Sequence, residues 1–257
     1  MGKKKAKEKK VEMVVAGVQR RFGPRSLVRG RLPTAVNVGS SIPHISTGFP
    51  QLDQALAIGG LPKGKIAELV GLPTSGKTTL ALKFLAQAQT GKNQVGYIDQ
   101  ARYFDPDYAY RCGLDLSRLV VGTPYDLQEA LAMTETLAQR SNLAALLFDV
   151  QGSFWTDADA VRYLTALLNR MTAPLARSGM TLLFLSDIST DDTPILPALA
   201  HYASVRLRVV RERWLRLYSD IRGYEARVEV LKNRFGPAGR LVTLKIRFNG
   251  TVSGEDL

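Results

Sequence analysis

Residues 71 to 78 read GLPTSGKT, which matches the phosphate-binding pattern G-x-x-x-x-G-K-[ST]. An apolar stretch at 66–70 precedes the motif and an amphipathic stretch at 78–89 follows it, so it should join a buried strand to a helix. Gly71 and Gly76 would let the backbone turn successive N–H groups toward phosphate oxygens, and the helix N-terminus adds partial positive charge. The motif therefore predicts a loop that binds a nucleoside triphosphate.

The polar side chains of this loop have expected roles. Lys77 should reach the β and γ phosphates, the Thr78 hydroxyl should bind Mg²⁺, and Thr79 should help to hold the α and β phosphates. Besides Thr78, an acidic partner for Mg²⁺ is expected at the end of a buried strand. Asp149 directly follows the apolar residues 143–148. The predicted nucleotide-binding residues of the loop are Gly71, Pro73, Thr74, Ser75, Gly76, Lys77, Thr78 and Thr79.

Apolar stretches and amphipathic stretches alternate along the middle of the chain. This alternation predicts an α/β fold with a mostly parallel sheet and helices on both faces. Near the C-terminus, apolar residues alternate with Arg206 and Arg208, and later with Lys245 and Arg247, which is typical of half-exposed strands in an antiparallel extension of the sheet. We expect strands at 66–70, 95–99, 143–149 and 181–186, and helices at 78–89, 126–139 and 158–177, the last interrupted at Pro174.

The start of the chain differs from the rest. Six of the first ten residues are lysine, so we expect a disordered basic arm there. The apolar residues between 11 and 22 are spaced for a short helix that ends at Gly23. We therefore divide the 257 residues into an arm with a helix and linker, 1–44, and one core domain, 45–257.

Charge and composition narrow the class of protein. The formal net charge of +12 favours a polyanionic partner such as DNA, RNA or anionic lipid. The single Cys112 excludes a disulfide framework and fits a reducing cytoplasm. No stretch approaches the roughly 18 to 20 apolar residues of a membrane span, and the lysine-rich start lacks the apolar region of a signal peptide. We expect a cytoplasmic protein without a membrane segment.

Several motifs resemble, in the same order, those of the bacterial RecA family of ATP-dependent DNA strand-exchange recombinases. The segment QRRFGPRSLVRG is similar to the linker that follows the N-terminal oligomerisation helix of that family. The resemblance implies a RecA-like P-loop NTPase core, ATP as the nucleotide, and homo-oligomers formed through the N-terminal helix. The core motifs read ISTGFPQLDQAL, GGLPKGKIAELVG, YIDQARYFDPDYAYRCG, LLFDV, HYASVRLRV and ARVEVLKNR.

Further residue roles follow from this resemblance. Asp105 and Tyr108 match the residues that contact adenine and stack on it, although Tyr108 by itself could equally be a packing aromatic. Asp149 matches the second carboxylate on the metal side. Lys232 and Arg234 match the two basic residues with which one subunit senses the γ-phosphate of its neighbour. Without the resemblance, they would be polar positions on an exposed strand.

Two positions depart from the family in ways that affect hydrolysis. The family has a water-polarising Glu where this chain has Ala101, and Gln100 or a displaced Asp99 would be a poor substitute. The family also has a Gln, which relays γ-phosphate occupancy to DNA, where this chain has Asp187. A carboxylate there would repel a γ-phosphate unless it binds Mg²⁺ or is protonated. Gln100 and Asp187 remain candidate catalytic groups, and we expect slow hydrolysis or none.

Other departures concern DNA. The segments that correspond to the DNA-binding loops of the family, 151–158 and 189–199, look short, and the second carries Asp191 and Asp192. We also expect no counterpart of the C-terminal domain of the family. A different basic surface is predicted to bind DNA, although it could also be solvated strand faces and a hairpin tip. Its residues are Arg206, Arg208, Arg211, Arg213, Arg216 and Arg222, with Trp214.

Three hypotheses for function follow. The first is a nucleoid-associated repair or DNA-damage accessory that binds ATP, and also DNA or a RecA-type filament, but hydrolyses poorly. Its plan would be similar to that of ImuA, a truncated RecA-like member of the translesion mutasome, although ImuA-like chains often have eroded phosphate loops and this loop is intact. The second is an active minimal recombinase. The third is a nucleotide-controlled protein-interaction module without DNA binding.

Overall fold

The chain divides into two compact units, residues 1–41 and residues 42–257, and each is described by itself. Most of the two segments predicted to resemble DNA-binding loops, namely 151–157 and 189–196, lies outside the described residues. This computed structural model describes residues 2–23, 42–150, 158–188, 197–249 and 251–255.

The first unit contains one long helix. Helix α1 spans Gly2–Phe22, and Gly23 follows it with a left-handed φ of 96°. The expectation of a disordered arm is therefore wrong for residues 2–10, although the predicted end of the helix is confirmed. Lysine, alanine and glutamate favour helix, so a segment without apolar residues can extend a helix even where it has nothing to pack.

The second unit is built on a nine-stranded sheet with the order β11-β10-β9-β8-β3-β7-β6-β4-β5. Neighbouring strands from β5 to β8 run parallel, and β8 to β11 pair antiparallel. The predicted parallel sheet with an antiparallel extension is confirmed, except that β8 itself pairs parallel with β3. The strands are β3 Ile66–Gly71, β4 Val95–Asp99, β5 Leu119–Gly122, β6 Ala145–Val150, β7 Thr181–Asp187, β8 Val205–Leu217, β9 Asp220–Asn233, β10 Leu241–Asn249 and β11 Thr251–Glu255.

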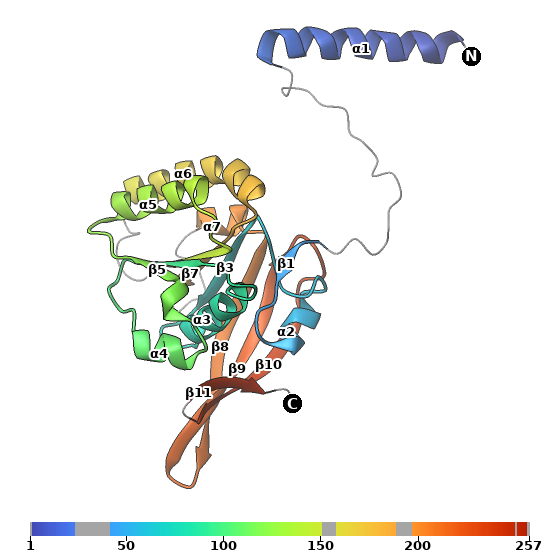
Figure 1. The fold of residues 1–257 in the computed structure, drawn as a ribbon. Coiled ribbons are helices and arrows are strands. Elements are labelled where there is room, and N and C mark those ends of the chain that lie inside the picture. Colours follow the sequence, from blue (N-terminus) through green and yellow to red (C-terminus); the bar gives the residue numbers. More distant parts are fainter. Residues whose placement is uncertain (1, 24–41, 151–157, 189–196, 250, 256–257) are drawn as a thin grey trace. The chain divides into compact units, whose positions relative to one another are not determined.

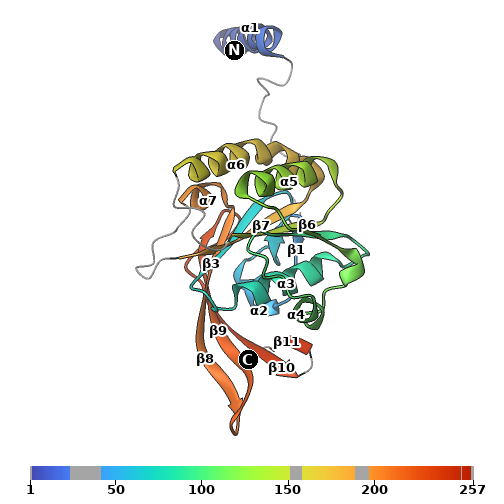
Figure 2. The same cartoon turned by 90° about the vertical axis from the view of Figure 1, so that its left-hand side faces the viewer.

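Helices cover both faces of the parallel part of the sheet, as Figures 1 and 2 show. Alternate residues of β6 feed two buried clusters, because Leu147 packs toward α3 while Leu146 and Phe148 pack toward α5 and α6. None of the helices in the described part of the chain is long and apolar enough to cross a membrane. One layer holds α2 Pro50–Ala55, α3 Lys77–Ala88 and α4 Pro106–Arg111, and the other holds α5 Leu127–Arg140, α6 Ala158–Ser178 and α7 Pro197–Tyr202.

Helix α6 continues through Pro174, so the predicted interruption there is wrong. Proline inside a helix removes one backbone hydrogen bond and costs about 3 kcal/mol relative to alanine. The apolar face of α6 is buried on both sides of this position, by Leu167 and Met171 before it and Leu175 after it. Burial of each such side chain contributes roughly 1.5 to 3 kcal/mol, so packing offsets the cost of the proline.

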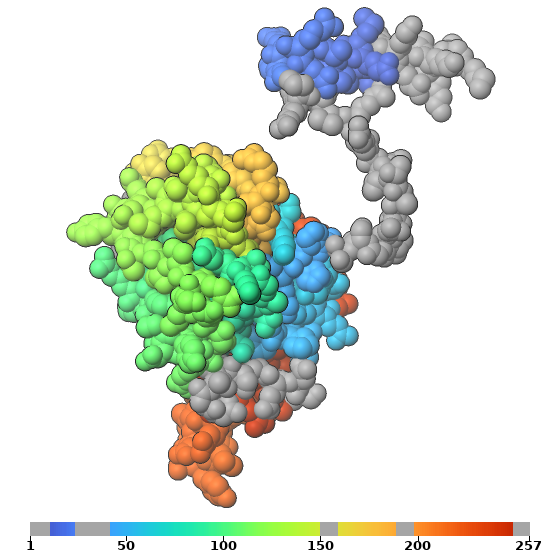
Figure 3. All heavy atoms as spheres, in the orientation of Figure 1, coloured from blue at the N-terminus to red at the C-terminus, as the bar shows by residue number. Residues whose placement is uncertain are grey.

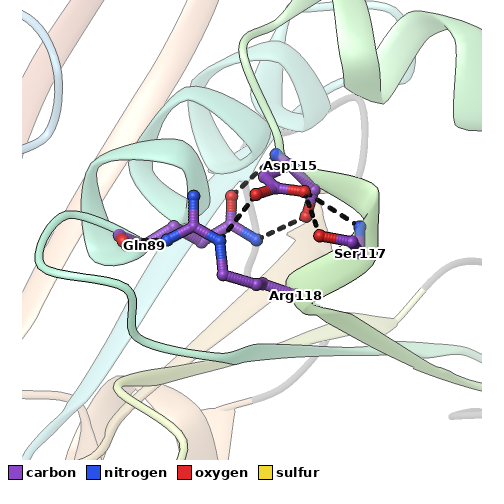
Figure 4. Close-up of polar contacts among 4 residues, drawn as sticks. All are labelled: Gln89, Asp115, Ser117 and Arg118. Carbon is purple, nitrogen blue, oxygen red and sulfur yellow. Dashed lines mark hydrogen bonds and ion pairs between the residues drawn. The ribbon is translucent and has the colours of Figure 1, made fainter.

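A polar network fixes the end of α3 that lies away from the phosphate loop (Figure 4). Gln89 is the C-cap of α3, and its side-chain amide forms two hydrogen bonds of 2.8 Å with the backbone of Asp115. The Asp115 carboxylate accepts from Ser117 and from the Arg118 guanidinium, and these contacts hold the pKa of this carboxyl below its usual range. The network ties α3 to the 3-10 helix η1 Leu116–Arg118, which leads into β5. Elsewhere in this unit, β1 His44–Ile45 and β2 Leu61–Pro62 form a separate two-stranded sheet.

A buried ion pair joins the three strands around β3. Glu68 on β3 is 1% exposed and accepts hydrogen bonds of 2.5 Å from the Ser186 hydroxyl on β7 and from Nε of Arg206 on β8. The Arg206 side chain is only 11% exposed. Its guanidinium is therefore engaged with Glu68 on the neighbouring strand, and its contact with DNA stays a prediction.

This ion pair gives a prediction about stability. Glu68→Gln should lower the free energy of unfolding by about 3 kcal/mol, because it leaves the Arg206 guanidinium buried without its counter-charge. Glu225→Gln is the matched control. Glu225 also pairs with an arginine of β8, but the side chain of that partner, Arg213, is 71% exposed, so the loss should be clearly smaller. Urea unfolding of both variants measures the difference, and equal losses would contradict the assignment.

Candidate functional site

The phosphate loop lies between the end of β3 and the start of α3, as predicted. Thr74 and Gly76 have left-handed φ values of 62° and 102°. A Cβ at Gly71 would lie 2.4 Å from the Val209 carbonyl oxygen, and one at Gly76 would lie 2.7 Å from the Tyr224 hydroxyl oxygen. Gly76 is therefore required by its backbone conformation, and both glycines are required by the close approach of β8 or β9.

The loop borders a cavity of about 450 Å³. Because Gly76 is the N-cap of α3 and has no side chain to accept from the first turn, the amides of that turn can bind an anion. All the loop residues predicted to bind nucleotide line this cavity except Gly71, which ends β3. The lining residues are Pro73, Thr74, Ser75, Gly76, Lys77, Thr78, Thr79, Tyr103, Tyr108, Asp187, Trp214, Tyr224 and Phe248.

Lys77 is held by three acceptors. Its ammonium donates to the carbonyl oxygens of Gly71 and Leu72, each at 2.8 Å, and to Oδ1 of Asp187 at 2.9 Å. The side chains of Lys77 and Asp187 are 6% and 19% exposed, so this ion pair is shielded from solvent. The structure thus brings together two residues that the sequence separates by 110 positions.

The two threonines of the loop differ in their surroundings. Thr78 lines the cavity and is available for the predicted role as a metal ligand. Thr79 is buried, and its Oγ1 shares a hydrogen bond of 2.7 Å with the Tyr108 hydroxyl. Burial raises the pKa of Tyr108 above its ordinary value, so this phenol keeps its proton. Tyr108 therefore lines the cavity and is joined to Thr79 at the phosphate loop, and its contact with adenine stays a prediction.

The partner predicted beside Tyr108 lies elsewhere. Asp105 is exposed and does not line the cavity. Its carboxylate caps the N-terminus of α4 by accepting a hydrogen bond of 3.0 Å from the Tyr108 amide. In this structure, Asp105 thus orients the helix that carries Tyr108, and its direct contact with a base stays a prediction.

Four aromatic residues that the sequence did not place at the site complete the cavity: Tyr103, Trp214, Tyr224 and Phe248. They come from the turn after β4 and from strands β8, β9 and β10. Trp214 and Tyr224 are direct partners in the β8–β9 register and stack edge to face, with ring centroids 6.0 Å apart. The β8–β9 register brings Trp214 and Tyr224 to the phosphate loop. The alternation of residues within each strand does not reveal this pairing.

The acidic residues at the strand ends are already engaged in contacts with the protein. Asp149 is the second-last residue of β6, is 1% exposed and accepts a hydrogen bond of 2.7 Å from the Tyr97 hydroxyl. Burial, together with the negative charge of Asp149, raises the pKa of Tyr97. The Asp99 carboxylate accepts from the amides of Tyr103 and Phe104, at 3.0 and 2.9 Å. Asp99 therefore shapes the turn after β4.

The two candidate catalytic groups separate in space. Asp187 lines the cavity, whereas Gln100 does not. The Gln100 side chain is 8% exposed, and neither its amide nitrogen nor its amide oxygen has a hydrogen-bond partner in the described structure. The Ala101 methyl group cannot polarise water. Among the described residues that line the cavity, Asp187 alone carries a carboxylate.

The predicted trans-subunit residues lie at the end of β9. Lys232 donates to the carbonyl oxygens of Ala200 and His201, and Arg234 also donates to that of His201. Burial and the nearby positive charge of Arg234 lower the pKa of Lys232. Within one chain, both cations neutralise the C-terminal carbonyls of α7. Their contact with the phosphate of a neighbour stays a prediction.

The remaining basic candidates lie on the β8–β9 hairpin, which projects from the core in Figures 1, 2 and 3. Arg213 forms two hydrogen bonds with Glu225, and Arg222 pairs with Asp220 at 3.2 Å. The Arg211 guanidinium lies 4.2 Å from the centre of the Trp214 ring. Arg216 is exposed, and Arg208 and Arg211 line a second cavity behind the phosphate loop. The hairpin is basic, but several of its charges already have partners.

The chain is similar to known proteins over most of its length. The family model described as the RecA N-terminal domain matches residues 9–253. Protein RecA of Rubrobacter xylanophilus is 31% identical over an alignment that covers 97% of this chain and 77% of that protein. Protein RecA of Legionella pneumophila is 32% identical with the same coverage. Protein RecA of Sinorhizobium medicae is 32% identical over 96% of this chain and 73% of that protein.

Trp214 provides a test of the cavity. In a Trp155→Phe background, Trp214 is the only tryptophan, and its side chain is 40% exposed. Addition of ADP or ATP should shift its emission to shorter wavelength, because a ligand between the loop and the aromatic wall displaces water from the ring. Further replacement by Trp214→Phe should abolish the signal. Nucleotide binding detected by calorimetry without any change in emission would place the ligand away from this wall.

Proposed function

The chain belongs to the RecA family, and from this membership we propose that it is an ATP-binding protein of DNA recombination and repair that holds ATP more readily than it hydrolyses it. The observation that carries the proposal is a complete phosphate loop next to a strand end that lacks a water-orienting carboxylate. Ala101 occupies that position, and Asp99 is bound to two backbone amides. Loss of a general base or a water-orienting group lowers rates by orders of magnitude.

The residues present fit a nucleotide with Mg²⁺. The left-handed Thr74 and Gly76 shape a loop whose amides can meet phosphate oxygens, and neither Gly71 nor Gly76 has room for a side chain. Lys77 and Thr78 would hold the phosphates and the metal, with Asp149 as the second carboxylate on the metal side and Tyr108 against adenine. When bound, ATP supplies the phosphoanhydride bond, and Mg²⁺ neutralises part of its charge.

The basic hairpin supports an interaction with DNA. Exposed arginines next to aromatic residues suit phosphate contact and base stacking, and the net charge of +12 strengthens attraction to a polyanion. We also propose that α1, with exposed Val11, Met13 and Val14, mediates homo-oligomerisation, in which Lys232 and Arg234 would reach the nucleotide of a neighbour. The proposed location is the cytoplasm, in association with the nucleoid.

Within this function, we place the chain as an accessory in the DNA-damage response. It would act on DNA or on a RecA-type filament, with a plan similar to that of ImuA in translesion mutagenesis, and residues 45–257 would form its ATP-binding core. The missing carboxylate at Ala101 and the ion pair formed by Asp187 support this reading. The intact loop favours a second candidate, an active minimal recombinase, which the following measurement distinguishes.

The first test compares ATP hydrolysis by the wild type and by Ala101→Glu, with and without single-stranded DNA. The wild type should turn over slowly in both conditions, and Ala101→Glu should raise the rate by about a hundredfold, because it restores a carboxylate at the strand end. Ala101→Gln is the matched control, since it has similar size without charge. Rapid DNA-stimulated hydrolysis by the wild type, with helical filaments in electron micrographs, would establish the minimal recombinase instead.

The second test measures the salt dependence of binding to single-stranded DNA. The double variant Arg216→Ala, Arg222→Ala should bind more weakly and lower the slope of log K against log salt by roughly 1 to 2, since each cation releases counterions from phosphate. Arg170→Ala, which removes an exposed arginine of α6 paired with Glu135, should leave the slope unchanged. Absence of DNA binding by the wild type even at low salt would support the interaction module without DNA binding.

A further inference from the structure

The parallel pairing of β3 with β7 brings an acidic side chain to the phosphate loop. Asp187, the last residue of β7, lies opposite Gly71, the last residue of β3. The Ile188 amide, one residue later, donates to the Gly71 carbonyl at 3.4 Å. The backbone of β7 is thus fixed to the start of the loop, and the Asp187 side chain extends from that point into the cavity that the loop borders.

The Asp187 carboxylate takes the place of an anionic ligand for Lys77. A lysine ammonium has three N–H donors and no acceptor. Here they are directed to two backbone carbonyls of the loop and to the Asp187 carboxylate, at 2.8, 2.8 and 2.9 Å. Only the carboxylate brings a full negative charge. The cation that should recognise phosphate is thus neutralised by the protein itself, in surroundings where both side chains are largely shielded.

A nucleotide that binds through Lys77 must take a hydrogen bond from these acceptors and then remain beside a carboxylate. Any nucleotide loses the same ion pair. A triphosphate in addition brings its γ-phosphate to the lysine, and therefore closest to Asp187, where two like charges in a shielded site repel strongly. A diphosphate lacks that group. The two ligands therefore differ in the repulsion that they meet.

We infer that Asp187 is a specificity-determining residue that disfavours the γ-phosphate, so that the site holds nucleoside diphosphate in preference to triphosphate. This inference rests on the nucleotide site of the proposed function and deepens it. An acidic residue at position 187 could act in two opposite ways. A carboxylate that binds Mg²⁺ would strengthen triphosphate binding, whereas a carboxylate that competes with phosphate for Lys77 weakens it. The observed partner is Lys77.

The test is calorimetric titration of the full chain with ADP, ATP and the β,γ-imido analogue of ATP, each in excess Mg²⁺. The wild type should bind ADP more tightly than either triphosphate. Asp187→Asn keeps the shape of the side chain and an acceptor for Lys77 but removes the charge. It should raise affinity for both triphosphates by about tenfold more than it raises affinity for ADP.

Two further variants complete the test: a control for the loss of one negative charge, and a second neutral replacement of Asp187. Asp159→Asn removes an equal charge from an exposed position of α6, where Asp159 pairs with Arg162, and should leave all three affinities unchanged. Asp187→Gln repeats the neutralisation with a longer side chain, in case the asparagine variant folds poorly. Urea unfolding of each protein verifies that its fold is intact. Relative to the wild type, the preference for ADP over ATP should fall in both Asp187 variants and should be unchanged in the Asp159→Asn control.

The outcomes are distinguishable. Equal gains for ADP and triphosphates in the Asp187 variants would overturn the discrimination while leaving the nucleotide site in place. Weaker triphosphate binding in these variants would overturn it in favour of a metal-binding role for Asp187. If neither the wild type nor a folded Asp187 variant binds any of the three nucleotides, the nucleotide site of the proposed function is itself refuted.

Discussion

The position of β3 between two parallel neighbours is the constraint on which the rest of the site depends. Its pairing with β7 sets Asp187 beside Gly71, and its pairing with β8 brings the Val209 carbonyl against the same glycine. The carboxyl ends of parallel strands lie at one edge of the sheet, so a shift of any of the three strands would change the loop and its acidic neighbour together. The ion pair of Glu68 with Arg206, and its hydrogen bond with Ser186, hold this register from within the sheet.

The same register explains why binding and hydrolysis are separable properties of this site. Groups that bind phosphate belong to the loop and to the first turn of α3, and their geometry depends on glycine conformations that β8 and β9 enforce. Groups that would orient water belong to the end of β4, where the Asp99 carboxylate serves the following turn instead. Because the two sets lie on different elements, one can be kept while the other is lost.

Charge is distributed in a similarly divided way. Arg206 stabilises the interior of the sheet, Lys232 and Arg234 neutralise the end of α7, and Arg211 stacks on an aromatic ring at the cavity. Only part of the basic character of β8 and β9 is thus directed to solvent on the projecting hairpin. The net charge indicates that the protein attracts a polyanion. The contacts of each arginine decide which parts of the surface can bind it.

The sequence alone determined the local features. The spacing of apolar residues predicted β3, α3, β4, α5 and β7 to within one or two residues, because each element buries a face that its own period defines. The motif at 71–78 predicted the phosphate loop, because its glycines and lysine act through local backbone geometry. The resemblance to the family also identified Ala101 and Asp187 as departures from its pattern. It did not show which residues they contact.

Tertiary structure alone decided the contacts between distant segments. Trp214 and Tyr224 reach the loop through the antiparallel register of β8 and β9, and Asp187 reaches Lys77 through the parallel register of β3 and β7. Alternation within a strand shows which residues share a face, but it does not show which residues of the neighbouring strands lie beside them. That is why the sequence did not show that Arg206 is largely shielded: burial of a charge depends on a partner, here Glu68, that lies 138 residues away in the sequence.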